Sequence, residues 1–245
     1  MPKEEKVELL FLKNPCRRGY EASGDSHRDG DALPDSKETP LERFSNDDNL
    51  SFYIGGEDPV VEPPGFHGPN VWPNLPEEKF HGPVWDYYAE TTKLSRTIWE
   101  ILLQGLGSAI LGKARLRPGS LAWGRTTDFG GVTVLLQQPG KEGLEVYQEG
   151  TQEWLQIPSI EGVYAIDCGD MIQKWSGGEY KSARHRVINK GDSGRLSCAT
   201  FWHGDFNATN SLNPNDPSKD TVGHLLAKRF GNQFSLPKEV LMATR

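Results

Sequence analysis

The sequence has few cysteines, and they are far apart. Cys16, Cys168 and Cys198 are the only three among 245 residues, and no Cys-x-x-Cys pair occurs. An odd number of isolated cysteines argues against a disulfide framework and against a cysteine-based zinc site. This usage is typical of a reducing compartment, so we expect a cytoplasmic protein.

Long hydrophobic runs and a surplus of positive charge are also absent. No stretch approaches the roughly 20 apolar residues that a membrane-spanning helix needs. The segment from Met1 to Glu8 is charged, so we expect neither a secretory signal nor a membrane partner. Lys and Arg number 27 against 34 Asp and Glu, a net charge of −7. This balance argues against a nucleic-acid partner, which is bound largely through its phosphates.

The composition changes once along the chain. Residues 1–83 are loop-rich, whereas residues 84–245 carry a helix and then short strands, and we expect one domain overall. Apolar residues at helical spacing predict a helix from Val84 to Leu106. Six short β-branched and apolar runs follow, bounded by turn residues: 132–136, 143–147, 154–157, 163–166, 185–188 and 196–202. Such strands indicate a sandwich or jelly roll more than a parallel α/β sheet.

Three segments of the strand-rich part resemble one known family. Residues 126–136 read Thr-Thr-Asp-Phe-Gly-Gly-Val-Thr-Val-Leu-Leu. They resemble the strand with the first two iron ligands, His-x-Asp-Phe-Gly, in the isopenicillin-N-synthase-like branch of the Fe(II)/2-oxoglutarate oxygenases. Residues 181–187, Lys-Ser-Ala-Arg-His-Arg-Val, are similar to the family's distal-histidine segment. Arg195-Leu196-Ser197 is similar to its Arg-x-Ser.

This resemblance implies a mainly β fold, a double-stranded β-helix (jelly roll) with a flanking α-helix. It implies an Fe(II) site with Asp128 and His185 as ligands and Thr126 in the place of the first histidine. It also implies that Arg195 and Ser197 bind the far carboxylate of 2-oxoglutarate. Two imidazoles and one carboxylate on one face of Fe(II) leave three coordination positions for a 2-oxo acid and dioxygen. An arginine can bind a carboxylate through two parallel hydrogen bonds.

The sequence departs from the family at its first metal ligand. A neutral threonine hydroxyl is a poor substitute for imidazole on a divalent transition metal. We therefore expect either weakened, altered metal binding or loss of the metal site. His67, His81 and His203 are alternative imidazoles, which we interpret as loop or surface residues. The family also has a longer N-terminal region, so residues 1–83 are expected to be a shortened version of it.

Two functions are compatible with these residues. The first is an oxygenase that hydroxylates, desaturates or cyclises a small organic substrate. The second is a non-oxidative or catalytically inactive descendant, which binds a small molecule or serves as the companion subunit of an intact paralogue in a homo- or hetero-oligomer. Metal binding discriminates between them.

The threonine gives a first prediction. If Asp128 and His185 are the only protein ligands, Thr126→His should raise the Fe(II) affinity about tenfold or more, because changes beyond the direct ligands alone alter metal affinity by ~10–100-fold. The measurement is metal content and succinate release for both proteins after the same anaerobic loading. An unchanged metal content in the variant would contradict the prediction.

Overall fold

The computed structural model describes residues 3–14, 16–21, 51–57, 68–110, 127–188, 194–210, 212 and 218–234. The chain forms two compact units. The first unit consists of Met1–Tyr87 with Asp220–Arg245, and the second of Tyr88–Lys219. Within the described part of the chain, no helix is both long and apolar enough to cross a membrane.

The first unit combines short elements with an aromatic cluster. Its elements are α1 (Lys3–Glu8), η1 (Phe11–Lys13), β1 (Gly19–Glu21), β2 (Ser51–Tyr53), η2 (Glu77–Lys79), the start of α3 (His81–Ile110) and α5 (Val222–Phe234). Strands β1 and β2 pair antiparallel. The ring of Phe52 packs edge-on against Phe80, with centroids 5.2 Å apart, and Trp72 packs against both Phe80 and Trp85. None of the site residues expected from the sequence belongs to this unit.

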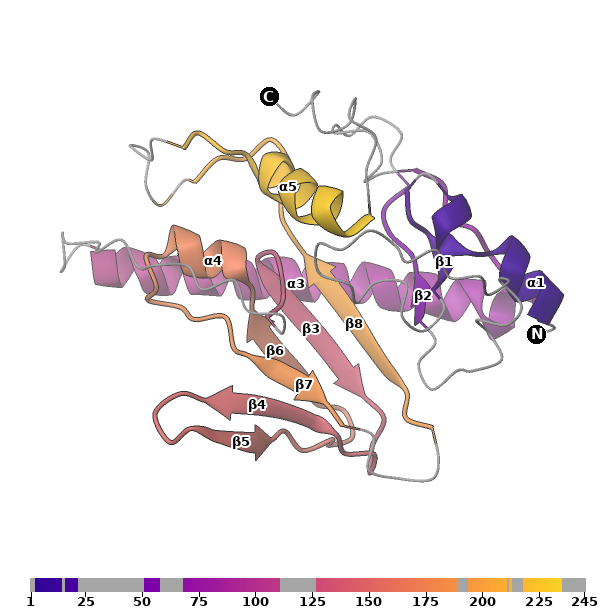
Figure 1. Cartoon of the computed structure of the whole chain (residues 1–245), viewed down its shortest axis with the longest axis horizontal. Helices are drawn as coiled ribbons and strands as arrows, with labels where there is room; N and C mark the ends of the chain where they lie inside the picture. The colour runs from indigo at the N-terminus through magenta and orange to yellow at the C-terminus, as the bar shows by residue number, and fades with distance from the viewer. Residues whose placement is uncertain are drawn as a thin grey trace. The chain divides into compact units, whose positions relative to one another are not determined.

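The second unit contains two antiparallel three-stranded sheets (Figure 1). The first sheet has the order β6-β3-β8, formed by Tyr164–Cys168, Val132–Gln137 and Ser197–Trp202. The second has the order β5-β4-β7, formed by Glu153–Gln156, Leu144–Gln148 and His185–Val187. Helix α4 (Asp170–Trp175) follows β6 directly. The six strands coincide within a few residues with the six apolar runs.

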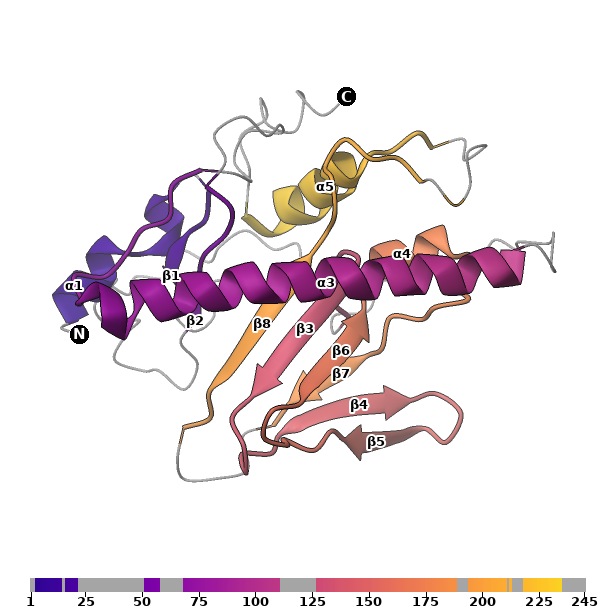
Figure 2. The same ribbon diagram turned by 180° about the vertical axis from the view of Figure 1, so that it is seen from behind.

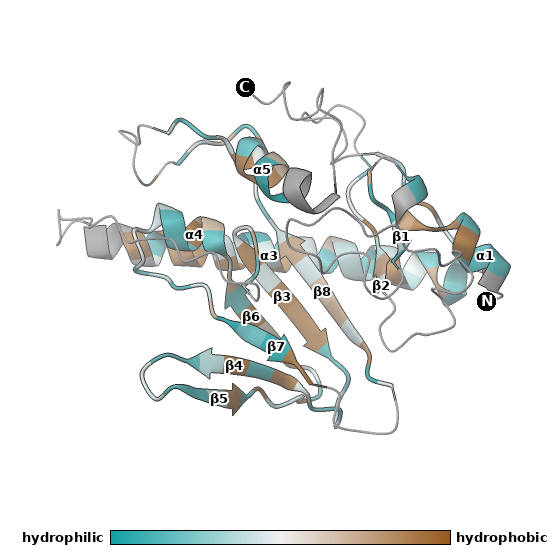
Figure 3. Cartoon of the chain, viewed as in Figure 1, coloured by the Kyte–Doolittle hydropathy of each residue, from teal (hydrophilic) through white to brown (hydrophobic). Residues whose placement is uncertain are grey.

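Strand β3 is the centre of the first sheet. Its sequence Val-Thr-Val-Leu-Leu-Gln is β-branched and apolar, which suits a strand with neighbours on both edges. Figure 3 shows it as a hydrophobic strand. Val132 and Val134 are buried almost completely.

Helix α3 covers one face of this sheet, as Figure 2 shows from behind. The Thr200 hydroxyl donates to that of Thr91 at 2.8 Å, and the rings of Trp99 and Trp202 lie 5.2 Å apart. Thr200 is the β8 partner of Val134 in the ladder, so Val134 points toward the helix too. The helix predicted over 84–106 is confirmed and extends further at both ends.

The opposite face of the sheet carries polar side chains. Thr133 of β3 lies across from Asp167 of β6 and from Phe201 of β8. Because side chains alternate along a strand, all three point away from α3. Gln137 and its partner Ser197 lie on this same face, four residues further along the strands. This inner face therefore presents the residues from which a polar site can be built.

Two partner residues on the helix-facing side of the sheet predict different sensitivities to truncation, because one is buried and the other is exposed. Val134→Ala should lower the free energy of unfolding by about 2 kcal/mol, because it removes two buried methyl groups and leaves a cavity. Ile166 is the β6 partner of Val134 but is 45% exposed. Ile166→Ala, which removes more atoms, should cost about 1 kcal/mol or less. Denaturant titration measures both; equal losses would contradict the assigned burial.

Candidate active site

The backbone around Asp128 is fixed by the start of α4. The Asp170 amide donates to the carbonyl of Asp128 at 2.9 Å, and the Met171 amide donates to Gly130 at 3.1 Å. The Thr127 hydroxyl donates to the Asp170 carboxylate at 3.1 Å. These bonds hold the turn before β3 against the turn after β6. The Asp128 side chain therefore extends from a turn that hydrogen bonds hold in place.

Two glycines allow this close approach. A Cβ atom on Gly169 would overlap the carbonyl oxygen of Gly130. Gly130 itself has a φ of +118°, and a Cβ there would overlap the imidazole of His203. Only glycine meets both demands, since other residues rarely adopt this φ. The first glycine of the Phe-Gly-Gly motif is thus a packing requirement for the position of Asp128.

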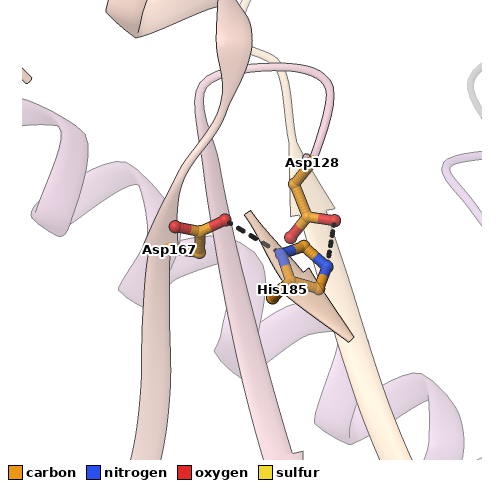
Figure 4. A group of neighbouring side chains, drawn as sticks. All are labelled: Asp128, Asp167 and His185. Carbon is orange, nitrogen blue, oxygen red and sulfur yellow. Dashed lines mark ion pairs between the residues drawn. The ribbon is translucent and has the colours of Figure 1, made fainter. Parts of the chain in front are cut away.

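His185 lies in β7, opposite Val146 of β4. Its Nε2 is 3.5 Å from Oδ1 of Asp128, as Figure 4 shows. Its Nδ1 is 3.1 Å from the carbonyl oxygen of Ala183. A carbonyl oxygen only accepts, so Nδ1 carries a hydrogen. Nε2 is therefore the ring nitrogen that faces Asp128 and that could bind a metal ion.

The segment before His185 is tied to two helices. The Tyr180 hydroxyl donates to the carbonyl of Leu102 in α3 at 3.0 Å. The Ser182 amide donates to the side chain of Gln173 in α4 at 2.7 Å. These two bonds fix the segment that enters β7. They therefore help to position the His185 side chain on the inner face.

A second carboxylate, Asp167, lies on the other side of the imidazole. Its Oδ2 is 3.8 Å from Nδ1 of His185, and Figure 4 shows the ring between the two carboxylates. This oxygen is buried and has no hydrogen-bond partner. Burial, and then the negative charge of Asp128, raise the pKa of Asp167 to about 7. His185 acts in the opposite direction on this pKa but does not offset them.

Sequence reasoning missed Asp167. Asp167 belongs neither to the segment that resembles His-x-Asp nor to the segment that resembles the family's distal histidine. A signal was nevertheless present, because β6 reads Tyr-Ala-Ile-Asp-Cys and a charged residue interrupts a mostly apolar strand. An aspartate at an inward position of a strand needs a partner or a cation.

Asp128, Asp167 and His185 form the only group of three or more potential metal ligands among the described residues. One ligand atom from each lies within 4.8 Å of the others. Thr126 lies just outside the described residues, as does His67.

The other candidate histidines lie elsewhere. His81 belongs to the first unit, with Nδ1 4.0 Å from Glu77. His203 packs against Gly130 and Phe129 but is not in the group. Burial lowers the pKa of His203 to about 4, so this imidazole is neutral at pH 7. His203 lies directly after β8, in a loop as expected, but its Nδ1 is buried and has no hydrogen-bond partner.

Arg195 and Ser197 lie at the far end of the inner face. Nη2 of Arg195 donates to Oε1 of Gln137 at 3.0 Å, and the arginine Cδ lies beside Gly143, the residue before β4. The Nε of Arg195 is buried without a hydrogen-bond partner, and burial lowers the pKa of this guanidinium. From Asp167 to Ser197 the ladder advances four residues, about 13 Å along the strands.

Comparison with known proteins places the chain in a family. Residues 114–204 match the model of the 2OG-Fe(II) oxygenase superfamily. The chain is 59% identical over 260 residues to the "2-oxoglutarate-dependent dioxygenase thnC" of Trichoderma harzianum, covering 98% of this chain and 78% of that protein. It is 39% identical to "2-oxoglutarate-dependent dioxygenase caaD" of Aspergillus niger, covering 97% and 76%. The chain therefore belongs to the 2OG-Fe(II) oxygenase superfamily.

A solved structure supports the fold. A full-length Neurospora crassa protein, crystallised in complex with alpha-KG, superposes with a TM-score of 0.65 at 20% identity, covering 94% of this chain and 78% of that one. The expected double-stranded β-helix is thereby confirmed. The expected family, its enzymatic character and its use of Fe(II) and 2-oxoglutarate are confirmed by the sequence relatives.

The described residues fit both Fe(II) and 2-oxoglutarate. Carboxylates and a neutral imidazole are ligands that suit Fe(II). The Asp167 oxygen that lacks a partner needs a hydrogen-bond donor or a cation, because a buried charge without one is costly. The buried Nε of Arg195 has no hydrogen-bond partner, and a carboxylate of 2-oxoglutarate would supply an acceptor.

The raised pKa of Asp167 predicts a pH-dependent stability in metal-free protein. A free aspartate has a pKa of about 3.9, whereas Asp167 in the folded state has a pKa of about 7. The folded state therefore binds more protons in this window, and its stability falls as the pH rises through it. Asp167→Asn removes this loss. It should raise the free energy of unfolding at pH 8 by on the order of 1–3 kcal/mol, and by much less at pH 5.

The measurement is denaturant unfolding of both proteins in EDTA at pH 5 and pH 8. A difference between them that does not change with pH would show that Asp167 keeps an ordinary pKa in the folded protein.

Proposed function

We propose that this protein is an Fe(II)- and 2-oxoglutarate-dependent oxygenase that hydroxylates, desaturates or cyclises a small organic substrate. The proposal rests on one observation: Oδ1 of Asp128 lies 3.5 Å from Nε2 of His185, on the inner side of a sheet whose Gln137 is bonded to Arg195. We also propose a cytoplasmic location, which the widely spaced cysteines support.

Asp128 and His185 would hold the iron. The Asp128 carboxylate supplies negative charge, and its backbone bonds to α4 keep it in place. The His185 imidazole is oriented by its Nδ1–H bond to Ala183. Such an outer bond fixes the ring and raises its basicity toward a metal. When bound, the iron and 2-oxoglutarate would supply the oxidising chemistry with dioxygen as the oxidant: one oxygen atom would enter the succinate that forms as 2-oxoglutarate loses carbon dioxide, and the other would oxidise the substrate.

Arg195 and Ser197 would hold the far carboxylate of 2-oxoglutarate. Gln137 takes one guanidinium nitrogen of Arg195 and is itself fixed by a bond from its Nε2 to the Pro158 carbonyl at 3.4 Å. Gln137 is therefore a positioning residue, which leaves the buried Nε of Arg195 for the cosubstrate. Ser197 follows on the same face and adds a hydroxyl donor.

The substrate would contact apolar side chains of the inner faces. Phe201, across from Thr133, is 47% exposed, and Val187, next but one to His185, is 56% exposed. Exposed large apolar side chains beside convergent polar groups are typical of a small-molecule site. They would exclude water from the reacting centre and favour a substrate with an apolar part.

The cosubstrate assignment predicts a charge-specific loss. Arg195→Gln should weaken 2-oxoglutarate binding about 10–100-fold, because a hydrogen bond to a charged group contributes about 1.5–3 kcal/mol. Arg186→Gln is the matched control, since Arg186 pairs with Glu145 at 2.8 Å on the outer face of the second sheet. Calorimetry with Mn(II)-loaded protein measures the affinity, and oxygen-dependent succinate release tests the function.

Equal 2-oxoglutarate affinity in Arg195→Gln and wild type would overturn the role of Arg195. Absence of both metal binding and succinate release in the wild type would overturn the proposed function, and would favour the inactive, binding or companion-subunit alternative.

A further inference from the structure

The proposed iron site is one ligand short if only the family motif is considered. Asp128 and His185 are two protein ligands, and position 126 offers only a threonine hydroxyl. Loss of one ligand from a chelate weakens it strongly, because metal affinity depends on ligand number and type. The second carboxylate beside His185, that of Asp167, is therefore the candidate to replace the missing imidazole.

The three side chains reach the same point from three parts of the fold. Asp128 comes from the turn before β3, Asp167 from β6 and His185 from β7 (Figure 4). Metal–ligand distances of about 2.1 Å separate neighbouring ligand atoms by roughly 3–4 Å. The three atoms here lie within 4.8 Å of one another. Since the imidazole lies between the two carboxylates, the His185 ring and the Asp167 carboxylate would have to rotate for Nε2 and both carboxylates to bind one ion.

A role for Asp167 in orienting His185 is not needed. Nδ1 of His185 already donates to the Ala183 carbonyl at 3.1 Å, whereas it is 3.8 Å from Asp167. A distance of 3.8 Å is too long for a hydrogen bond. Oδ2 of Asp167 consequently remains buried without a hydrogen-bond partner, next to a second carboxylate. A divalent cation bound by both carboxylates would give Oδ2 of Asp167 a partner and would remove the repulsion between the two negative charges.

We infer that Asp167 supplies the third protein ligand of the iron, in place of the imidazole that the family has at position 126. The inference rests on the proposed function. The resulting centre has two carboxylates and one imidazole, whose two negative charges balance a divalent cation. Its ligand set differs from the two-histidine, one-carboxylate set of the family.

Metal affinity tests the inference without turnover. Mn(II), which is stable in air, is titrated into each protein, and the free ion is followed by its electron paramagnetic resonance signal. Asp167→Asn should weaken Mn(II) binding about tenfold or more, since even residues beyond the direct ligands change metal affinity by ~10–100-fold. Asp167→His should recover most of this loss, because its Nδ1 is as far from Cβ as a carboxylate oxygen is.

Glu145→Gln is the matched control. Glu145 is a buried carboxylate of the second sheet, but it pairs with Arg186 on the outer face. The variant removes one negative charge from the same unit and should leave Mn(II) affinity unchanged. Circular dichroism of all variants checks that each is folded.

A second substitution distinguishes a wrong role for Asp167 from a wrong proposed function. With Asp167 as a ligand, Thr126→His should raise Mn(II) affinity more in the Asp167→Asn background than in the wild type, because the new imidazole then fills an empty position. Wild-type affinity in Asp167→Asn, or equal gains in both backgrounds, would overturn the role of Asp167 and leave the oxygenase proposal intact. No Mn(II) binding by the wild type would overturn the proposed function itself.

Discussion

The site depends on the hydrogen bonds that join the turn before β3 to the turn after β6. Amides of Gly169, Asp170 and Met171 donate to carbonyls of Gly131, Asp128 and Gly130. This pairing extends the β3·β6 ladder beyond its last strand residues. It thereby fixes the positions of the two carboxylates of the site relative to each other. Asp128 lies on one side of the pairing, and Asp167 precedes the other side by two residues. Any displacement of one turn would move both carboxylates relative to His185.

Much of this arrangement could be predicted from local sequence. The alternation of residues 132–136 and the helical spacing of 84–106 are properties of single segments, and both elements formed where expected. Asp128, His185, Arg195 and Ser197 were singled out because they stand in segments that resemble a family motif. The structure brings Asp128 to His185 and places Arg195 and Ser197 on the inner side of the first sheet.

Asp167 could not be found in the same way. Its closeness to His185 depends on the register of β6 with β3 and on the packing of two separate sheets. Neither property can be predicted from the sequence of a single segment. The burial of His203 was also missed, since it follows from the glycine at position 130, which admits the imidazole where any side chain would exclude it. Tertiary contacts of this kind decide which polar residues share a site.

The hydrogen bonds that fix the segment before β7 have a consequence for the dynamics of the protein. Tyr180 and Ser182 are bonded to α3 and α4, and His185 follows three residues after Ser182. A local opening that breaks these bonds would release the imidazole together with the segment. A ligand that binds only the closed form shifts such an opening equilibrium by mass action. Amide hydrogen exchange of the segment from Tyr180 to Val187 would therefore slow if a metal ion bound to His185, because the ion would bind only the closed form.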